Sequence, residues 1–515
     1  MSSIDATPSS LAAASSGMDV ASRTDVHKLH GGAIGLVGVL QLTVTGAAPI
    51  TAMLGNVPIV VGNGVGVGAP AAFLFATIVL TIFSVGYAEM ARKVSAVGGF
   101  YSFISHGLGR ESGMALALGS IVAYSVFEAS LAGGFAYFAS AKLAGWGITT
   151  IPWPYLSMVM LAAVAACSYF DVKISVAILG VALIGEVIAL TVFDIGVFTN
   201  PGVTANPAAL NPLAAFQGFD APGGNLTAGV ASIGLFFAFW SWVGFEMAPN
   251  YAEESKNPKK IIPLSLYISV ISLGIFYIIT SWAALSAYPT PADAIAAGQT
   301  DAANFFMKPA STLVGPWLGD VMSYLILISS FACGMAFHNT AARYLYSLGR
   351  EGILPKAVGK THPVYKAPYV ASFTQSAIAA VLVIVFAAAL GKDDPNQAYA
   401  GLYGLMALFG TTLILVAQAV VSLAIIAYFK REHPDDHHWF KTLLAPAIAF
   451  VAQIAVIIML VLNLDFLSAG YSFAKWIPGL TVAILALGFG GAMILKRVNP
   501  AKYDSIGRMI YQGVE

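Results

Sequence analysis

Four carboxylic acids lie inside long apolar stretches of this 515-residue sequence, where an ionisable group is a candidate for chemistry. Glu186 stands near the middle of the stretch at 174–199 and has no Lys or Arg within two turns on its own helix. Burial would allow its carboxyl group to take up and release a proton, and it could instead coordinate sodium. A structural hydrogen bond from a permanently protonated acid is the third interpretation. We expect Asp194 and Glu246 to be structural.

Glu128 lies one helical turn after Tyr124 and one turn before Ala132, so these three residues share one face of a helix. If that face lines a cavity, Glu128 could bind the distal amine of a cationic or diamine substrate. A proton site and a hydrogen bond to a neighbouring helix are the alternatives. In the stretch at 314–345, Phe337 is a candidate for the wall of the cavity. His338 beside it is a candidate gate or pH sensor, although a lone histidine is more often a packing residue.

Two apolar stretches contain residues that break helices. Residues 45–51 read Thr-Gly-Ala-Ala-Pro-Ile-Thr, in which Pro49 has no N–H group and Gly46 lowers the cost of unwinding. Residues 239–244 read Phe-Trp-Ser-Trp-Val-Gly, and Pro249 follows. Broken backbone at membrane depth is tolerated only where it is buried in protein or lines a cavity, so we expect a binding site here. The alternative is that these residues only kink their helices.

Unwound helices offer backbone groups that suit both ends of an α-amino acid. Free N–H groups at a positive helix end favour a carboxylate, and free carbonyl groups favour an ammonium group. An amino acid could therefore be held at both poles without any charged side chain, while the surrounding helices select its side chain.

The elements that position these residues must be membrane-spanning helices. The chain is 58% hydrophobic and 10% charged, against roughly 45–50% and about 25% in soluble domains, which argues against a soluble enzyme. Lys and Arg together number 25, as do Asp and Glu, so no basic surface for nucleic acid is indicated. Cys167 and Cys333 lie in separate apolar runs and read as buried thiols, and no metal site is predicted.

Twelve stretches are long enough to cross ~30 Å of hydrocarbon. They lie at 33–61, 69–91, 113–140, 153–171, 174–199, 226–250, 261–288, 314–345, 369–390, 401–429, 442–464 and 473–495. The Ser- and Ala-rich residues 1–32 are predicted to be a disordered cytoplasmic tail. Residues 62–68, Gly-Asn-Gly-Val-Gly-Val-Gly, lack the strand and the Lys-Ser/Thr of a phosphate loop, and we expect a flexible outer loop there.

The distribution of Lys and Arg gives an orientation. With the N-terminus inside, 21 of these residues fall on the cytoplasmic side and four fall outside, namely Lys142, Lys308, Lys392 and Lys475. Short cytoplasmic loops carry the excess of positive charge, so we expect both termini in the cytoplasm.

Three motifs resemble those of the amino acid/polyamine/organocation superfamily of secondary transporters. Residues 97–102, Val-Gly-Gly-Phe-Tyr-Ser, resemble its GGxY element. Residues 244–246, 253–258 and 262–263 resemble its signature at helices 6 and 7. Asn339, Arg343 and residues 349–355 resemble its end of helix 8. The motifs stand in the family's order, and the resemblance extends from about residue 33 to 500.

The resemblance implies an all-α fold of the LeuT type with a five-plus-five inverted repeat and broken helices 1 and 6. The first repeat would span 33–199 and the second 226–429, with an outer loop at 200–225 and helices 11 and 12 within 430–515. It assigns the substrate carboxylate to Gly46, Ala47 and Ala48. It assigns the amine to Phe239, Trp240 and Gly244.

By the same resemblance, Trp240 aligns with a tryptophan that occludes the substrate in one member. Glu186 falls where many members carry a lysine that stands in for sodium, and this sequence departs from that pattern.

These observations predict a membrane transporter, not an enzyme. We expect it to import amino acids across the cytoplasmic membrane by alternating access, coupled to protons through Glu186, with sodium as an open alternative and no cofactor. A transporter of polyamines or cationic amines, an amine exchanger and an amine sensor are the rival functions. The residues predicted to contact substrate are Thr45, Gly46, Ala47, Ala48, Tyr124, Glu128, Phe239, Trp240, Ser241, Gly244 and Phe337. The preferred amine and the oligomeric state are not predicted.

Overall fold

The computed structural model describes residues 32–94, 98–169, 172–468 and 470–507. Residues 1–31 of the predicted tail and Val97 of the first motif therefore lie outside the described residues. Within the described residues the chain is helical and has no strand. It contains two isolated β-bridges, Ile34 to Ser255 and Phe219 to Gly229.

The long helices agree with the predicted stretches to within several residues at most ends. They are α2 (Leu36–Ala47), α3 (Pro49–Ile59), α4 (Ala69–Lys93), α6 (Arg110–Gly145), α7 (Trp153–Ser168), α8 (Val172–Phe198), α9 (Ala231–Trp240), α10 (Pro258–Ser286), α13 (Pro316–Arg350), α14 (Tyr369–Leu390), α15 (Leu405–Arg431), α16 (Ala445–Leu462) and α18 (Ile477–Val498). Shorter helices outside those stretches are α5 (Gly99–Leu108), α11 (Pro291–Thr300) and α19 (Pro500–Ser505).

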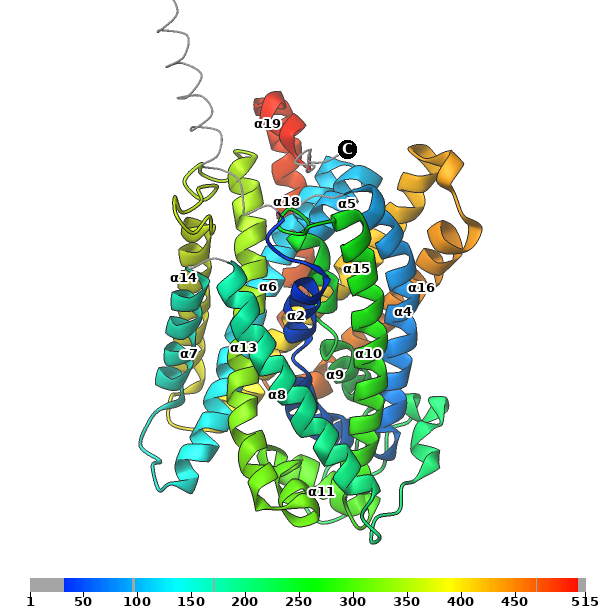
Figure 1. Cartoon of the computed structure of the whole chain (residues 1–515), viewed down its shortest axis with the longest axis vertical. Helices are drawn as coiled ribbons and strands as arrows, with labels where there is room; N and C mark the ends of the chain where they lie inside the picture. The colour runs from blue at the N-terminus through cyan, green and yellow to red at the C-terminus, as the bar shows by residue number, and fades with distance from the viewer. Residues whose placement is uncertain (1–31, 95–97, 170–171, 469, 508–515) are drawn as a thin grey trace, which may run out of the picture.

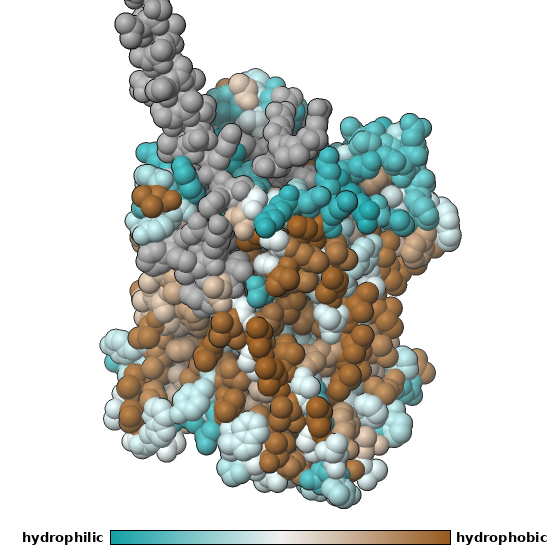
Figure 2. All heavy atoms as spheres, viewed as in Figure 1, coloured by the Kyte–Doolittle hydropathy of each residue, from teal (hydrophilic) through white to brown (hydrophobic). Residues whose placement is uncertain are grey.

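Ten helical segments among the described residues are long and apolar enough to cross a membrane. The first of them runs from Leu36 to Lys93 over 58 residues and joins two predicted stretches, and α7 is a shorter apolar helix. The chain is thus consistent with a multi-pass membrane protein, and the count of twelve crossings stays a prediction. Figure 2 shows apolar side chains over the middle of the visible face, with hydrophilic side chains gathered at one end.

Helices α2 and α9 lie inside the bundle (Figure 1), where α2 packs next to α10, α13 and α8, and α9 packs next to α4, α3 and α16. Helices α7 and α14 form one outer edge, and α16 lies at the opposite edge (Figure 1). The two ends of the bundle are named here by the short helices that they carry. The α5 end also carries α19, and the α11 end lies opposite (Figure 1).

Both predicted helix breaks are present. Helix α2 ends at Ala47 and α3 begins at Pro49, and Ala48 between them has φ of +44°, a left-handed conformation that costs a residue with a Cβ about 1–2 kcal/mol. Helix α9 ends at Trp240, and Gly244 with φ of +127° leads into a 3₁₀ segment at Phe245–Tyr251. A Cβ on Gly244 would lie 2.4 Å from the carbonyl carbon of Gly46, so the two breaks pack directly against each other.

The prediction of a flexible loop at residues 62–68 is wrong. The structure has a π-helical turn at Val60–Val65 and a 3₁₀ turn at Gly66–Gly68, and most of these residues are buried. A Cβ on Gly62 would lie 2.7 Å from the carbonyl carbon of Gly298 in α11, and one on Gly64 would lie 2.6 Å from the Cα of Gly234 in α9. These glycines therefore allow close backbone packing, which a periodicity argument cannot distinguish from a loop.

Candidate functional site

A small cavity lies at the two helix breaks. Its wall from α2 and α3 consists of Gly46, Ala47, Ala48, Thr51, Ala52 and Asn56. The other helices contribute Leu131, Trp240, Ser241, Val243, Cys333, Phe337 and Tyr403. The cavity holds about 20 Å³, close to the room that one water molecule needs. An amino acid can enter only when these walls move apart.

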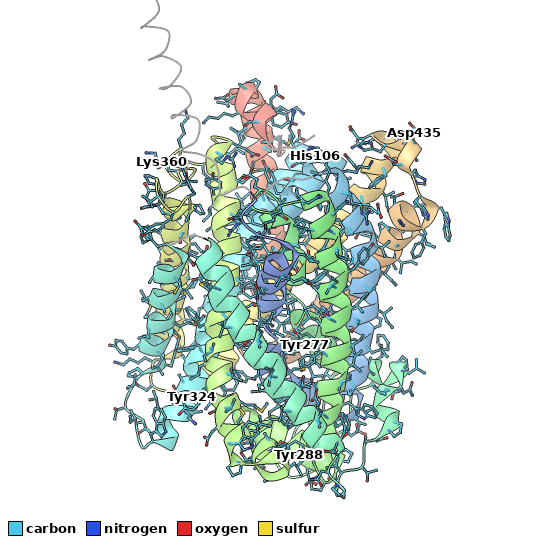
Figure 3. All side chains as sticks on the ribbon, in the orientation of Figure 1. His106, Tyr277, Tyr288, Tyr324, Lys360 and Asp435 are labelled. Atoms are coloured by element: carbon cyan, nitrogen blue, oxygen red, sulfur yellow. The ribbon has the colours of Figure 1, made fainter. Side chains whose placement is uncertain are left out.

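The depth of the cavity in the bundle follows from Tyr277 of α10. Its hydroxyl donates a hydrogen bond of 3.0 Å to the carbonyl of Ala47, at the end of α2. Tyr277 lies between the two ends of the molecule, well away from Lys360 at the α5 end and from Tyr288 at the α11 end (Figure 3). The helix breaks are therefore placed near mid-depth, where an unwound backbone is costly unless it serves a site.

Three helix ends meet at this cavity. The C-terminal ends of α2 and α9 carry partial negative charge, and the N-terminal end of α3 carries partial positive charge. None of the described lining residues carries a carboxylate, ammonium or guanidinium group. The buried hydroxyl of Thr51 has no hydrogen-bond partner among the described residues. The cavity thus offers helix ends and hydroxyl groups for polar atoms, and apolar side chains for the rest of a ligand.

A thin layer of neutral side chains closes the cavity towards the α11 end. The Tyr403 hydroxyl donates to Asn56 Oδ1 at 2.7 Å, and Trp240 Nε1 donates to the Tyr403 hydroxyl at 3.3 Å. Asn56 Nδ2 donates in turn to Ser241 Oγ at 2.8 Å. Beyond this layer lies a second cavity of about 240 Å³, lined by Tyr403, Phe236 and Asn63 among others. Tyr403 therefore separates the two cavities.

The closure towards the α5 end contains buried ion pairs. Arg343 of α13 donates from Nη2 to both carboxylate oxygens of Glu254 at 2.7 and 3.0 Å, and both side chains are 4% exposed. Arg350 pairs with Glu253 at 3.1 Å. The amide of Ile34, ahead of α2, donates to the carbonyl of Glu254 at 2.9 Å. Charge pairs and backbone hydrogen bonds together hold this side.

Glu186 of α8 reaches the break in the first span. Its Oε2 accepts a hydrogen bond of 3.2 Å from the amide of Ile50, in the first turn of α3. Its Oε1 has no hydrogen-bond partner among the described residues, and the side chain is fully buried. A carboxyl group in this place must hold a proton or a cation, or face a large desolvation cost.

The structure brings together part of the predicted substrate site. Gly46, Ala47, Ala48, Trp240, Ser241 and Phe337 line the cavity, and Gly244 packs on Gly46 behind it. Thr45, Tyr124, Glu128 and Phe239 do not line the cavity in this closed arrangement. The amide of Ala48 donates within its own helix, to Val44 and Thr45. The N–H groups nearest to a ligand carboxylate are therefore those at the start of α3.

Tyr124 and Glu246 form a polar contact beside the second helix break. The Tyr124 hydroxyl donates to Glu246 Oε1 at 2.9 Å, and Glu246 Oε2 accepts from the amide of Gly244 at 2.9 Å. The carboxyl group thus satisfies a backbone amide that the break leaves free, as expected for a structural acid. Asp194 accepts from the Thr280 hydroxyl at 2.8 Å.

The sequence analysis missed several residues of the cavity wall. Leu131, Cys333 and Tyr403 belong to no motif and are ordinary residues of apolar stretches, while Val243 lies in the quoted run 239–244 but was given no role. Helical spacing was one available signal, because Cys333 lies one turn before Phe337 and Leu131 lies two turns after Tyr124. The amide side chain of Asn56 was another available signal, because a polar side chain in an apolar stretch is a candidate for a cavity wall.

Known proteins match this chain over almost its whole length. Residues 38–502 match the family model for amino acid permeases. The branched-chain amino acid permease BcaP of Bacillus subtilis (strain 168) is 25% identical over 462 residues, which cover 86% of this chain and 90% of that protein.

Two further relatives differ in what they carry. The glutamate/serine transporter AimA of Bacillus subtilis (strain 168) is 30% identical over 160 residues, or 30% of this chain and 29% of its own length. The low-affinity putrescine importer PlaP of Escherichia coli (strain K12) is 22% identical over 332 residues, or 62% of this chain and 69% of its own length.

Proposed function

Because the chain belongs to the amino acid permease family, we propose that it is a secondary transporter that imports neutral amino acids with apolar side chains across the cytoplasmic membrane. The observation that carries this proposal is the cavity itself. Its wall has polar groups at the helix breaks and in the layer of Asn56 and Tyr403, apolar side chains elsewhere, and no charged side chain. The name of the relative BcaP, a branched-chain amino acid permease, agrees with such a substrate.

In the proposed binding mode the two poles of the amino acid face different helix ends. The carboxylate lies at the N-terminal end of α3, near the Thr51 hydroxyl, and the ammonium group lies near the C-terminal ends of α2 and α9. The side chain then points towards Phe337, Trp240 and Leu131. A diamine lacks the carboxylate, and no residue of the wall offers an acid to its second ammonium group, so Glu186 at the end of α3 would have to stay ionised to bind it. The cavity therefore favours amino acids over putrescine.

The topology that we propose has twelve crossings. The helical run from Leu36 to Lys93 would be about 87 Å long as one straight helix, far more than the roughly 30 Å of hydrocarbon, so it fits two crossings. The break between α2 and α3 and the break after α9 each lie in the first helix of one proposed repeat, as in a five-plus-five inverted repeat. The excess of Lys and Arg at the α5 end supports a cytoplasmic location for that end.

The location of the Glu186 carboxyl group supports a proposal of proton coupling through this residue. Glu186 occupies the N-terminal end of α3, which is also the proposed place of the substrate carboxylate. Two ionised carboxylates at one helix end repel each other, and a proton on Glu186 removes this repulsion. Substrate and proton would then bind together and leave together. Alternating access requires that the thin layer at Tyr403 and the ion pairs at Arg343 open in turn.

Uptake into proteoliposomes with an imposed pH gradient tests the coupling. We expect Glu186→Gln to abolish accumulation of leucine driven by the gradient and to retain exchange of internal for external leucine. Asp194→Asn is the matched control, because Asp194 is a second buried acid of the same helix and should leave accumulation intact. Accumulation at the wild-type rate in Glu186→Gln would contradict the assignment. Accumulation by the wild-type protein that is driven by a sodium gradient would identify sodium, and not the proton, as the coupling ion.

A further inference from the structure

The molecule contains a buried ionisable pair that the proposed transport mechanism does not use. Glu128 of α6 and His338 of α13 both have 0% exposed side chains. His338 Nδ1 lies 3.1 Å from each carboxylate oxygen of Glu128. His338 Nε2 lies 2.8 Å from the hydroxyl of Ser372 in α14. Three helices therefore meet at one histidine side chain.

A glutamine completes this polar cluster. Gln375 of α14 donates from Nε2 to Glu128 Oε2 at 2.8 Å, and its Oε1 accepts from the Ser125 hydroxyl at 2.7 Å. Both carboxylate oxygens of Glu128 are thus engaged within the protein. A role of Glu128 as a direct ligand of the substrate would require the loss of these contacts.

Each member of the pair directly follows an aromatic residue at the proposed substrate pocket. Phe127 precedes Glu128 and Phe337 precedes His338 in the sequence. The rings of Phe127 and Phe337 have centroids 5.1 Å apart, and the ring of Phe127 lies 4.6 Å from that of Trp240. Phe337 and Trp240 line the cavity. Phe127 does not line the cavity itself, but it packs on both rings that do, so the pair adjoins the residues that set the position of this aromatic wall.

A hydrogen-bonded pair between two helices fixes their separation more strictly than apolar contacts do. Apolar side chains tolerate small shifts, whereas a buried donor and acceptor lose a large part of their interaction when they move apart. Buried polar pairs are best attested as devices that set the register of helices. Between α6 and α13, such a device determines the gap between Phe127 and Phe337.

We propose that Glu128 and His338 are a positioning pair that selects the size of the transported side chain by holding Phe127 and Phe337 at a fixed separation. The proposal rests on the function proposed above, because it names how that pocket discriminates among neutral amino acids. The hydrogen bond between Glu128 and His338 sets this separation. The hydrogen bond between His338 and Ser372 holds the imidazole ring in the orientation that this contact needs.

Two substitutions of His338 separate the two hydrogen bonds. The amide nitrogen of His338→Asn can take the place of Nδ1 and keep the contact with Glu128, whereas that of His338→Gln reaches the place of Nε2 and keeps the contact with Ser372. We expect His338→Asn to retain the wild-type ratio of KM for alanine to KM for leucine. We expect His338→Gln to change this ratio by about ten-fold, because one misfitting methylene costs 10-fold or more in an apolar pocket.

Two further variants complete the experiment. Glu128→Gln keeps hydrogen-bonding groups without the charge, so it should preserve the ratio of KM for alanine to KM for leucine at every pH. If Glu128 were instead a proton site, this substitution would abolish the pH dependence of transport. Thr374→Ala removes a hydroxyl from α14 that bonds only its own helix, at Val370, and is the matched control. The yield of monodisperse protein and the maximal rate are measured for each variant.

The outcomes distinguish the pair from the transport proposal. A changed KM ratio in His338→Gln alone supports the positioning pair. Equal ratios in all variants, or a fall in maximal rate that is the same for every substrate, would overturn it. Wild-type protein that binds and moves diamines but no amino acid would instead overturn the proposed function. In that case KM is measured for diamines of different length in the same variants. If the order of these KM values is the same in every variant, the positioning role of Glu128 and His338 is again contradicted.

Discussion

The two closures of the central cavity are built from different interactions. Towards the α11 end, Tyr403, Asn56 and Trp240 form one layer of neutral hydrogen bonds with a larger cavity directly beyond it. Towards the α5 end, one buried ion pair, one partly buried ion pair and a backbone bridge hold the helices together. A neutral hydrogen bond contributes about 0.5–1.5 kcal/mol, whereas breaking one partner of a buried ion pair costs about 3–5 kcal/mol.

This difference indicates which side opens more readily. Opening at the α11 end separates a few neutral groups that water can solvate at small cost. Opening at the α5 end must separate the bidentate contact of Arg343 with Glu254, the second ion pair and the backbone hydrogen bonds of Ile34, so more interactions are lost there. We infer that the substrate-free protein reaches the α11-open state more often than the α5-open state. Such an imbalance agrees with the proposed import, in which the α11 end would face the outside.

The largest effect is expected for Arg343→Ala. This change leaves the buried carboxylate of Glu254 without its partner, so the α5 closure should weaken by about 3–5 kcal/mol. A lower melting temperature and faster labelling of cysteines placed at the α5 end are the measurements. Arg350→Ala is the matched control with a smaller expected effect, because its ion pair is more exposed, at 16% and 11%. Equal effects of the two substitutions would contradict the importance of the buried pair.

A smaller effect is expected for Tyr403→Phe. The hydroxyl group is lost while the ring stays, so the contacts with Asn56 and Trp240 disappear. About 1 kcal/mol of closure at the α11 end should be lost, which raises the open population by roughly five- to ten-fold. Labelling of the cavity thiol of Cys333 from the external side reports this change. Unaltered labelling would mean that aromatic packing, and not the hydroxyl group, closes this side.

The smallest effect concerns pH at the α5 end. Burial raises the pKa of Glu351, after the end of α13, to about 7, against the lowering effect of hydrogen bonds from Tyr101 and from the amide of Gly507. Because the pKa is raised on folding, the neutral acid supports the docked segment at low pH, and that support is lost as pH rises through about 7. The amide of Gly507 should therefore exchange hydrogen more readily at pH 8 than at pH 6, after correction for intrinsic rates.

Glu351→Gln provides the control for this pH effect. The variant has no titrating group at this position, so protection of the Gly507 amide should become independent of pH in the same range. A pH dependence that persists in Glu351→Gln would assign the effect to another group.

The helix breaks could be predicted from the sequence because Gly46, Pro49 and Gly244 alter the backbone itself. Such residues act locally, and their effect does not depend on which helix lies beside them. Glu186 could also be singled out from the sequence, since a lone acid in an apolar helix is conspicuous. Its contact with Ile50 agrees with that expectation, although proton transfer stays a prediction.

The rest of the cavity wall depends on how helices face each other. Leu131, Cys333 and Tyr403 are chemically ordinary, and only the packing of α6, α13 and the turn before α15 brings them together. Glu128 shows the converse. Its face of α6 was predicted together with Tyr124, but its partner, His338, comes from a helix 210 residues away in the sequence. No local pattern could indicate that the acid and the histidine meet.

Protection of Cys333 tests the central claim most directly, which is that a neutral amino acid binds between the broken helices. The chain has two cysteines, so Cys167→Ser leaves Cys333 as the sole thiol, in the cavity wall and 3.1 Å from the carbonyl of Gly46. The rate at which a small thiol reagent labels it is measured with and without ligand. Leucine or valine should slow labelling in a saturable manner while putrescine does not. Equal labelling with and without the amino acids, or protection by putrescine alone, would contradict the claim.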